Sequence, residues 1–308
     1  MCAILSHRRA GPTRGPVRRD AAARRCEDAG RSRRAAAGEE DVVARVRHGK
    51  RLGFSYTLAI VVLRPLLLAL TKRDWHGAEH LRATVRPDGT QEGVIVCPNH
   101  ISWFDPLECA HFLYDNGRPP RFLAKEAVFR IPVVGAIIRG AGQIPVYRET
   151  ADAVHAVRDA VAALDRGECV VVYPEGTVSR DPGLWPMTGK TGAARIALAT
   201  GAPLLPMAQW GAQAVIRPYT AELRLIPRKT MGVRVGPPVD LDDLRGRPVD
   251  ADTLRIATER LMAAITALLE EVRGETAPRE RFDLRAHRAA EAARAAAEGG
   301  AAEGGRAV

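Results

Sequence analysis

The stretch "VIVCPNHISWFDPLECAHFLYDNG", residues 94–117, decides the fold class of this 308-residue chain. It opens with a short apolar, β-branched run, which predicts a strand buried on both faces. The polar cluster "NHISWFD" follows, and the remainder predicts a short helix ending near Gly117. Asp105 would be its N-cap, Pro106 its first residue and Glu108 the third, as in a capping box. Strand, loop and helix in this order are the repeating unit of parallel α/β sheets.

The same alternation continues along the chain. Apolar residues at helical spacing alternate with short continuous apolar runs, and the last helix is long and amphipathic, with Leu254, Leu261, Ile265, Leu268 and Val272 facing inward. We therefore predict an α/β domain with a mostly parallel central sheet flanked by helices. The expected helices cover residues 151–167, 188–202 and 252–274, and the expected strands cover 94–97, 169–173 and 203–209.

The net charge of +10 is concentrated at the N-terminal end. Residues 1–52 contain 14 Lys and Arg against 6 Asp and Glu, so they carry +8 of the total. We predict that residues 1–48 are a disordered basic extension, with a transit peptide or sequence upstream of a misassigned start as alternatives. Because the excess is local, no specific nucleic-acid binding is expected. Residues 276–308 are predicted to be a low-complexity tail without chemistry.

Residues 49–74 contain the single long apolar stretch, "GFSYTLAIVVLRPLLLAL". Arg64 and Pro65 divide it into halves too short to span a bilayer, and basic residues flank both ends. This favours an amphipathic helix or a broken helical hairpin lying in the membrane interface, peripheral or monotopic on the cytoplasmic face. A signal peptide and a helix docked on the globular domain are the alternatives.

The spacing of the cysteines and glycines disfavours a disulfide-bonded protein, a metal site and a nucleotide-binding P-loop. The five cysteines are odd in number and lack a C-x-x-C pair, which indicates reduced thiols, with Cys97 and Cys169 packed in the core. No metal site is expected. The run "GLWPMTGKT", residues 183–191, has five residues between its glycines where a P-loop needs four, so nucleoside triphosphate hydrolysis is disfavoured.

His100 and Asp105 are the candidate catalytic pair. In one continuous helix, side chains five positions apart diverge by roughly 140°, so the pair can meet only if His100 precedes the helix on the loop. Asp105 would then fix the imidazole tautomer and leave the other nitrogen as a general base, with a substrate hydroxyl as nucleophile. The alternatives are a histidine satisfied at a strand end and an aspartate that only caps the helix.

Two further fragments are candidates for the site. The first follows an expected strand and should reach the same edge of the sheet, and the second is a β-like run. "YPEGTVSRD", residues 173–181, is a tight turn that would expose backbone amides beside Glu175. "GQIPVYR", residues 142–148, ends at Arg148. Each fragment alone is also compatible with a solvated turn or a surface arginine.

The fragments together resemble the glycerolipid acyltransferases of the 1-acylglycerol-3-phosphate acyltransferase (PlsC) type. The first family motif, N-H-x-S-x-x-D, is matched by Asn99, His100, Ser102 and Asp105. The second, G-x-I-x-V-x-R, is matched by Gly142, Ile144, Val146 and Arg148. The third, F-P-E-G-T-R-S, is matched by Pro174, Glu175, Gly176, Thr177 and Ser179, with Tyr173 in place of Phe, and Pro206 in "LLPMA" matches the fourth.

One position departs from the family pattern. The arginine that follows E-G-T in the family, thought to help hold the acceptor phosphate, is Val178 in this chain. Lys125, Arg148, Arg180 or Lys190 could supply the charge instead, and a changed acceptor is equally consistent.

The resemblance implies a glycerol-phosphate acyltransferase-like fold, with the acyltransferase domain at residues 75–275. It implies acyl transfer from acyl-CoA or acyl-carrier protein, as co-substrate, to the sn-2 hydroxyl of lysophosphatidic acid, with membrane phospholipids as further partners and no cofactor. Another lysophospholipid, glycerol 3-phosphate or a glycolipid acceptor, and a non-catalytic lipid-binding protein, are the alternatives. The implied substrate-binding residues are Asn99, Ser102, Lys125, Arg148, Glu175, Gly176, Thr177, Ser179, Arg180 and Lys190.

Overall fold

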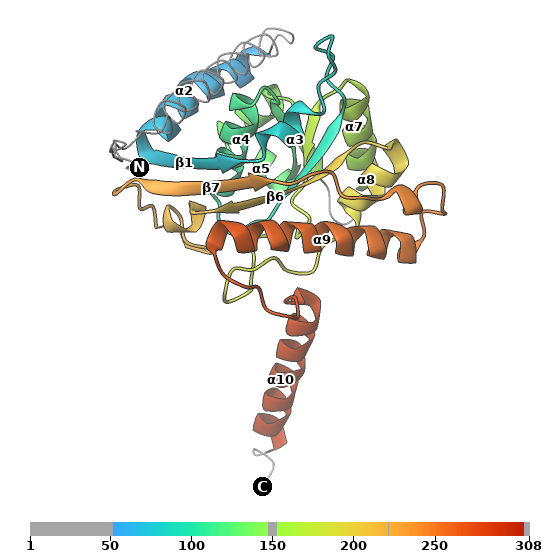
Figure 1. The fold of residues 1–308 in the computed structure, drawn as a ribbon. Coiled ribbons are helices and arrows are strands. Elements are labelled where there is room, and N and C mark those ends of the chain that lie inside the picture. Colours follow the sequence, from blue (N-terminus) through green and yellow to red (C-terminus); the bar gives the residue numbers. More distant parts are fainter. Residues whose placement is uncertain (1–51, 147–152, 221, 305–308) are drawn as a thin grey trace, which may run out of the picture. The chain divides into compact units, whose positions relative to one another are not determined.

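Figure 1 shows the computed structural model of the chain, which describes residues 52–146, 153–220 and 222–304. The chain divides into two units, Met1–Gly49 and Lys50–Val308, and all described residues lie in the second. A seven-stranded sheet forms the centre of this unit, in the order β1-β7-β6-β2-β5-β3-β4. The strands are β1 (Thr71–His76), β2 (Val94–Pro98), β3 (Pro120–Lys125), β4 (Ile144–Val146), β5 (Cys169–Val171), β6 (Leu204–Trp210) and β7 (Lys229–Val235).

Five adjacent strands, from β6 to β4, are mutually parallel. In the register, Val96 of β2 lies between Leu205 of β6 and Val171 of β5. β7 runs antiparallel to β6, and β1 is parallel to β7. The predicted mostly parallel sheet is therefore confirmed. The carboxyl ends of the five parallel strands, and the loops that follow them, meet at one edge of the sheet, where reactive groups of such folds gather.

Helices cover both faces of the sheet (Figure 1). Along β2, Ile95 and Cys97 belong to the core cluster shared with α7, α8 and α9, while Val94 and Val96 belong to the cluster shared with α3 and α4. The predicted burial on both faces is thus observed. The helices are α2 (Phe54–Leu70), α3 (Ala78–Arg82), α4 (Asp105–Asp115), α5 (Glu126–Phe129), α6 (Val134–Gly140), α7 (Ala153–Asp165), α8 (Gly192–Thr200), α9 (Ala251–Arg273) and α10 (Leu284–Gly304), with short 3-10 turns η1 (Ala212–Ala214) and η2 (Asp242–Leu244).

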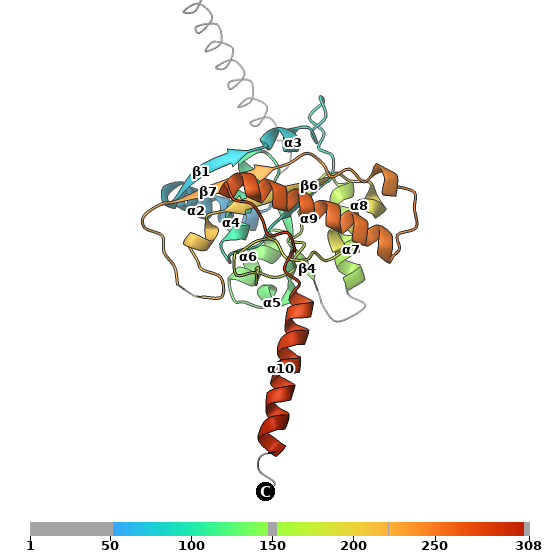
Figure 2. The same cartoon turned by 60° about the horizontal axis from the view of Figure 1, so that its bottom comes forward.

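The long helix α9 lies along one face of the sheet (Figure 2). It begins where the Asp250 side chain accepts the Thr253 N–H at 2.8 Å, and it ends at Gly274. Its buried face contains Leu254, Leu261 and Ile265, as predicted. Leu269, rather than Leu268 or Val272, completes that face, and these two side chains are half-buried beside Trp185.

The apolar N-terminal segment forms one helix, α2, rather than a broken hairpin, which agrees with one of the two predicted forms. The helix continues through Pro65 and ends at Leu70. Residues 71–74, expected to belong to the same helical segment, instead begin the edge strand β1, which pairs with β7 from Thr71 to His76. Within the described part of the chain, no helix combines the length and the apolar character needed to cross a membrane.

Both ends of the sequence were predicted to lie outside the folded domain. The basic extension, residues 1–48, falls outside the described residues. In the tail, Leu284–Gly304 forms the helix α10, in keeping with the high helix propensity of its many alanines. Cys97, Cys109 and Cys169 are free and buried, which confirms the predicted packing role of Cys97 and Cys169.

Candidate active site

The loop between β2 and α4 brings His100 and Asp105 together. His100 Nδ1 lies 2.9 Å from Asp105 Oδ2. The histidine side chain is 12% exposed, whereas the aspartate side chain is fully buried. An ionised carboxylate can only accept hydrogen bonds, so Nδ1 carries the proton and the lone pair is on Nε2. Among the described residues, no group bonds to Nε2, which leaves it for a substrate hydroxyl.

The Asp105 carboxylate is held by the loop rather than by the helix that it begins. Its Oδ2 atom also accepts the backbone N–H groups of Ile101, at 2.5 Å, and of Ser102, at 2.7 Å. The predicted capping box is wrong, because Asp105 accepts no bond from α4 and Glu108 makes none back. Burial raises the pKa of Asp105, and the bonds from His100 and the two amides act in the opposite direction.

Glu175 connects the two main sequence motifs. Its Oε1 accepts the backbone N–H of His100 at 2.9 Å, and its Oε2 accepts the backbone N–H of Met187 at 3.0 Å. The residue is 3% exposed, and burial raises its pKa to about 8. It was expected among the substrate-binding residues. Its position instead fixes the backbone beneath the imidazole.

Other expected substrate-binding side chains are also buried and bonded to the main chain. Asn99 exchanges two bonds with the backbone of Gln209, at 2.7 and 3.1 Å. The Ser102 hydroxyl donates to the Ile216 carbonyl at 2.7 Å. The Ser179 hydroxyl donates to the Trp185 carbonyl, while its N–H donates to the His100 carbonyl at 2.7 Å. These side chains position the loop.

Aromatic side chains surround the imidazole. The Tyr173 ring lies against His100, with centroids 4.3 Å apart and planes tilted by 32°. Trp103 approaches His100 edge-on at 6.4 Å and is 57% exposed. Gly176 adopts a φ of 68° in the adjoining turn, which a side chain would strain, and its N–H donates to the Tyr173 carbonyl.

The four candidate cations have different surroundings. The Arg180 guanidinium lies 3.5 Å from the centroid of the Tyr219 ring and is exposed. The Lys190 side chain lies beside Gly176, where an added Cβ would meet its Nζ at 3.0 Å. Lys125 is exposed at the carboxyl end of β3. Arg148 lies outside the described residues.

Val178 is 1% exposed, so its side chain packs into the core. Its carbonyl accepts a hydrogen bond from the Tyr219 hydroxyl, and the Tyr219 ring lies against the Arg180 guanidinium. Sequence reasoning missed Tyr219 and Gln209, because each acts on a motif residue far away in the chain. A polar glutamine ending the apolar run "LLPMAQ" was the available signal for Gln209.

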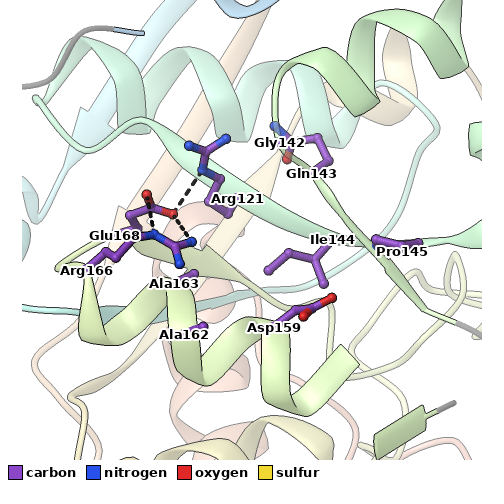
Figure 3. A pocket seen from close by; sticks show the side chains of 10 residues that line it. All are labelled: Arg121, Gly142, Gln143, Ile144, Pro145, Asp159, Ala162, Ala163, Arg166 and Glu168. Atoms are coloured by element: carbon purple, nitrogen blue, oxygen red, sulfur yellow. Dashed lines mark hydrogen bonds and ion pairs between the residues drawn. The ribbon is translucent and has the colours of Figure 1, made fainter. Parts of the chain in front are cut away.

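A separate cavity lies at the opposite edge of the sheet (Figure 3). It has a volume of about 220 Å³ and is lined by residues at the amino ends of β3, β4 and β5 and on α7. Arg121 and Arg166 there both bond to Glu168. None of the predicted site residues lines it. Within the described ranges, no group of three His, Cys, Asp or Glu side chains could hold a metal ion.

Comparison with known proteins identifies relatives of this domain. Residues 72–210 match the family described as Acyltransferase. A chloroplastic 1-acyl-sn-glycerol-3-phosphate acyltransferase of Brassica napus is 30% identical over 141 residues, which are 46% of this chain and 38% of that protein. A 1-acyl-sn-glycerol-3-phosphate acyltransferase of Borreliella burgdorferi is 33% identical over 118 residues, 38% of this chain and 45% of that protein. The chain thus spans less than half the length of these two relatives.

The fold is similar to that of a solved structure, the 1-acyl-sn-glycerophosphate acyltransferase PlsC from Thermotoga maritima. The TM-score is 0.52 at 22% identity, and the match covers 72% of this chain and 81% of that one. The expected fold class of the domain is thereby confirmed. Residues 72–210, which carry the motifs described above, are therefore similar to 1-acyl-sn-glycerol-3-phosphate acyltransferases.

Proposed function

We propose that the chain is an O-acyltransferase that transfers an acyl group from a thioester, acyl-CoA or acyl-carrier protein, to the sn-2 hydroxyl of 1-acylglycerol 3-phosphate, forming phosphatidic acid. The observation that carries this proposal is the His100–Asp105 pair on the loop that follows β2, at the carboxyl ends of the parallel strands. The names of the relatives support the choice of acceptor.

The geometry provides a general base and requires no protein nucleophile. His100 Nε2 takes the proton of the acceptor hydroxyl, and the oxygen attacks the thioester carbonyl. Asp105 keeps the proton on Nδ1 and stabilises the imidazolium that forms. When the tetrahedral intermediate collapses, the carbon–sulfur bond breaks and the imidazolium returns its proton to the thiolate, so the acyl ester and a free thiol leave.

The turn beside His100 supplies groups for the developing oxyanion. The Gly176 N–H already donates to the Tyr173 carbonyl. The N–H groups of Thr177 and Val178 have no acceptor among the described residues, so they are the donors that we assign to the oxyanion. Arg180, held over Tyr219, is the cation that we assign to the acceptor phosphate in place of position 178.

Membrane contact through α2 belongs to the same proposal. The side chains on its outward face are almost all apolar, and Phe54, Leu58, Val61, Val62 and Leu66 are 44–83% exposed. This apolar face would lie in the interface of the cytoplasmic leaflet, where acceptor and product reside. In this proposal the protein is a peripheral or monotopic membrane enzyme.

The first test measures free thiol and phosphatidic acid together, using membranes that carry the protein, palmitoyl-CoA and lysophosphatidic acid. His100→Ala is expected to lower turnover by roughly 10²- to 10⁴-fold, the usual contribution of a general base. His80→Ala, in α3, is the matched control and should retain activity. Retained turnover in His100→Ala would contradict the assignment of the base.

The acceptor is tested with the same assay. Arg180→Gln should raise the KM for lysophosphatidic acid more than it lowers kcat, whereas Arg158→Gln, an exposed arginine on α7, should change neither. Thiol release with glycerol 3-phosphate, another lysophospholipid or a glycolipid, but not with lysophosphatidic acid, would move the proposal to that acceptor. Lipid binding without thiol release from any donor would indicate a non-catalytic protein.

A further inference from the structure

The loop between η1 and β7 exposes apolar side chains that the proposed chemistry does not use. Leu223 is 56% exposed and Ile226 is 85% exposed. A backbone bridge between Ile216 and Leu223, and the bond from Arg224 N–H to the Val215 carbonyl at 2.8 Å, give this segment a defined shape. Two large aliphatic side chains three positions apart, both more than half exposed in a segment of defined shape, indicate a contact surface.

This loop is tied directly to the catalytic loop. Ser102 Oγ, two residues from His100, donates to the Ile216 carbonyl at 2.7 Å. The Tyr219 hydroxyl donates to the Val178 carbonyl in the third motif. These bonds fix the position of the η1–β7 loop relative to the His100 imidazole.

The same loop is tied to α2. The Arg228 guanidinium donates to the carbonyl of Leu68 at 2.9 Å and to that of Thr71, at the carboxyl end of the helix. Leu67 of α2, Phe104 of the catalytic loop and Leu225 of the η1–β7 loop also share one hydrophobic cluster. Figures 1 and 2 both place this loop at the end of the sheet where α2 ends. The η1–β7 loop, which also exposes apolar side chains, is therefore a neighbour of α2 beside the proposed active site.

The charged residues of the loop indicate which kind of partner it contacts. Between Val215 and Arg228 there are three arginines, Arg217, Arg224 and Arg228, and one acidic residue, Glu222. Protruding aliphatic side chains among basic residues fit the surface of a bilayer that contains anionic lipids. A protein partner is better served by a groove or a flat apolar core than by isolated tips.

We propose that Leu223 and Ile226 insert into the membrane surface as a second lipid contact, separate from α2, and hold His100 at the level of the acceptor glycerol. The purpose of this contact rests on the proposed function, but the contact itself is measured without turnover. Because the η1–β7 loop bonds both to the catalytic loop and to the end of α2, the two contacts together would fix the orientation of the catalytic loop toward the bilayer.

The test measures partition onto vesicles of phosphatidylcholine and phosphatidylglycerol. Leu223→Ser combined with Ile226→Ser should weaken partition by about tenfold or more, since two large apolar side chains are withdrawn from lipid. Val249→Ser, at an apolar side chain that is 42% exposed in the loop before α9, is the matched control and should partition as the wild type does. The comparison is repeated with Leu58→Ser and Val62→Ser, so that α2 does not mask the effect of the loop. Unchanged partition in both backgrounds would overturn the proposal.

Two further measurements distinguish lipid contact from a role in shaping the site and from contact with a second copy of the chain. The double variant should lose turnover on vesicle-embedded acceptor but retain it on a short-chain acceptor dissolved as monomers. Equal loss on both would show that the loop shapes the site rather than contacting lipid, and would overturn the proposal. A changed molecular mass in light scattering with unchanged partition would assign the surface to a second copy instead. If the wild type turns over neither acceptor, the proposed function fails while the partition result still decides the lipid contact.

Discussion

At the scale of single residues, Glu175 couples protonation to the stability of the site. Its two carboxyl oxygens accept the N–H groups of His100 and Met187, so it joins the first and third motifs. Burial raises its pKa from the ordinary 4.5 to about 8. Between these two values the folded protein holds a proton that the unfolded chain releases, and the unfolding free energy therefore falls as the pH rises.

Glu175→Gln tests this coupling. The wild type should lose stability relative to the variant as the pH rises from 4.5 to about 8, by at most about 1.4 kcal/mol per pH unit. Urea unfolding across that window measures the difference. Because the other titrating groups are common to both proteins, they cancel in the comparison. Parallel profiles would show that Glu175 is ionised throughout.

The pairing of His100 with Asp105 was one of the interpretations that their spacing allowed, because a histidine on the loop can reach an aspartate five positions later. The hydrogen-bond partners of the Asp105 carboxylate could not be predicted from the sequence. Its carboxylate could accept amides from the helix or from the loop, and the choice depends on the loop conformation. That conformation depends in turn on the bonds of Asn99 to Gln209, 110 positions away. Contacts of this range leave no local pattern in the sequence.

At the scale of elements, α2 is fastened to the helix that begins with Asp105. The Arg64 guanidinium bonds to both carboxylate oxygens of Asp115 at the end of α4, at 2.7 and 3.2 Å. Arg73 of β1 approaches the same carboxylate at 3.4 Å. A bidentate ion pair therefore joins α2, the proposed membrane helix, to α4, and its geometry is more specific than that of a single contact.

Arg64→Met should lower the free energy of unfolding by about 1 kcal/mol, because the arginine is 35% exposed and solvent screens part of the attraction. Arg73→Met is the matched control: its single longer contact and its 45% exposure predict a smaller loss. Chemical denaturation of the two variants gives the comparison. Equal losses would indicate that the paired geometry at Arg64 adds nothing.

The elements with a strong local pattern were predicted from the sequence, whereas β1 was not. The helices α4, α7, α8 and α9 show apolar periodicity, and β2, β5 and β6 are continuous apolar runs. The segment "TKRDWH" of β1 shows neither, since Thr71 alone is buried and the strand lies at the sheet edge. It is a strand because β7, more than 150 positions later, pairs with it.

At the scale of the whole molecule, charge and fold are separated along the chain. The parallel sheet and every described site residue lie in the unit Lys50–Val308, while most of the net positive charge lies before it. Sequence composition could locate this charge but could not identify the acceptor. Arg180, the cation that we propose for the acceptor phosphate, lies over the Tyr219 ring, and this contact between distant residues leaves no local pattern in the sequence.

Removal of residues 1–48 tests whether the basic extension contributes to function. All described residues of the proposed active site lie in the unit Lys50–Val308, so acyl transfer should survive deletion of this segment. Nonspecific affinity for duplex DNA at low salt should fall by about tenfold or more, because several arginines that could neutralise phosphates are lost. Acyl transfer and DNA binding are measured on the full chain and on residues 49–308 in parallel. DNA affinity that persists in residues 49–308 would place a basic binding surface on the folded unit, and loss of acyl transfer would show that the extension completes the enzyme.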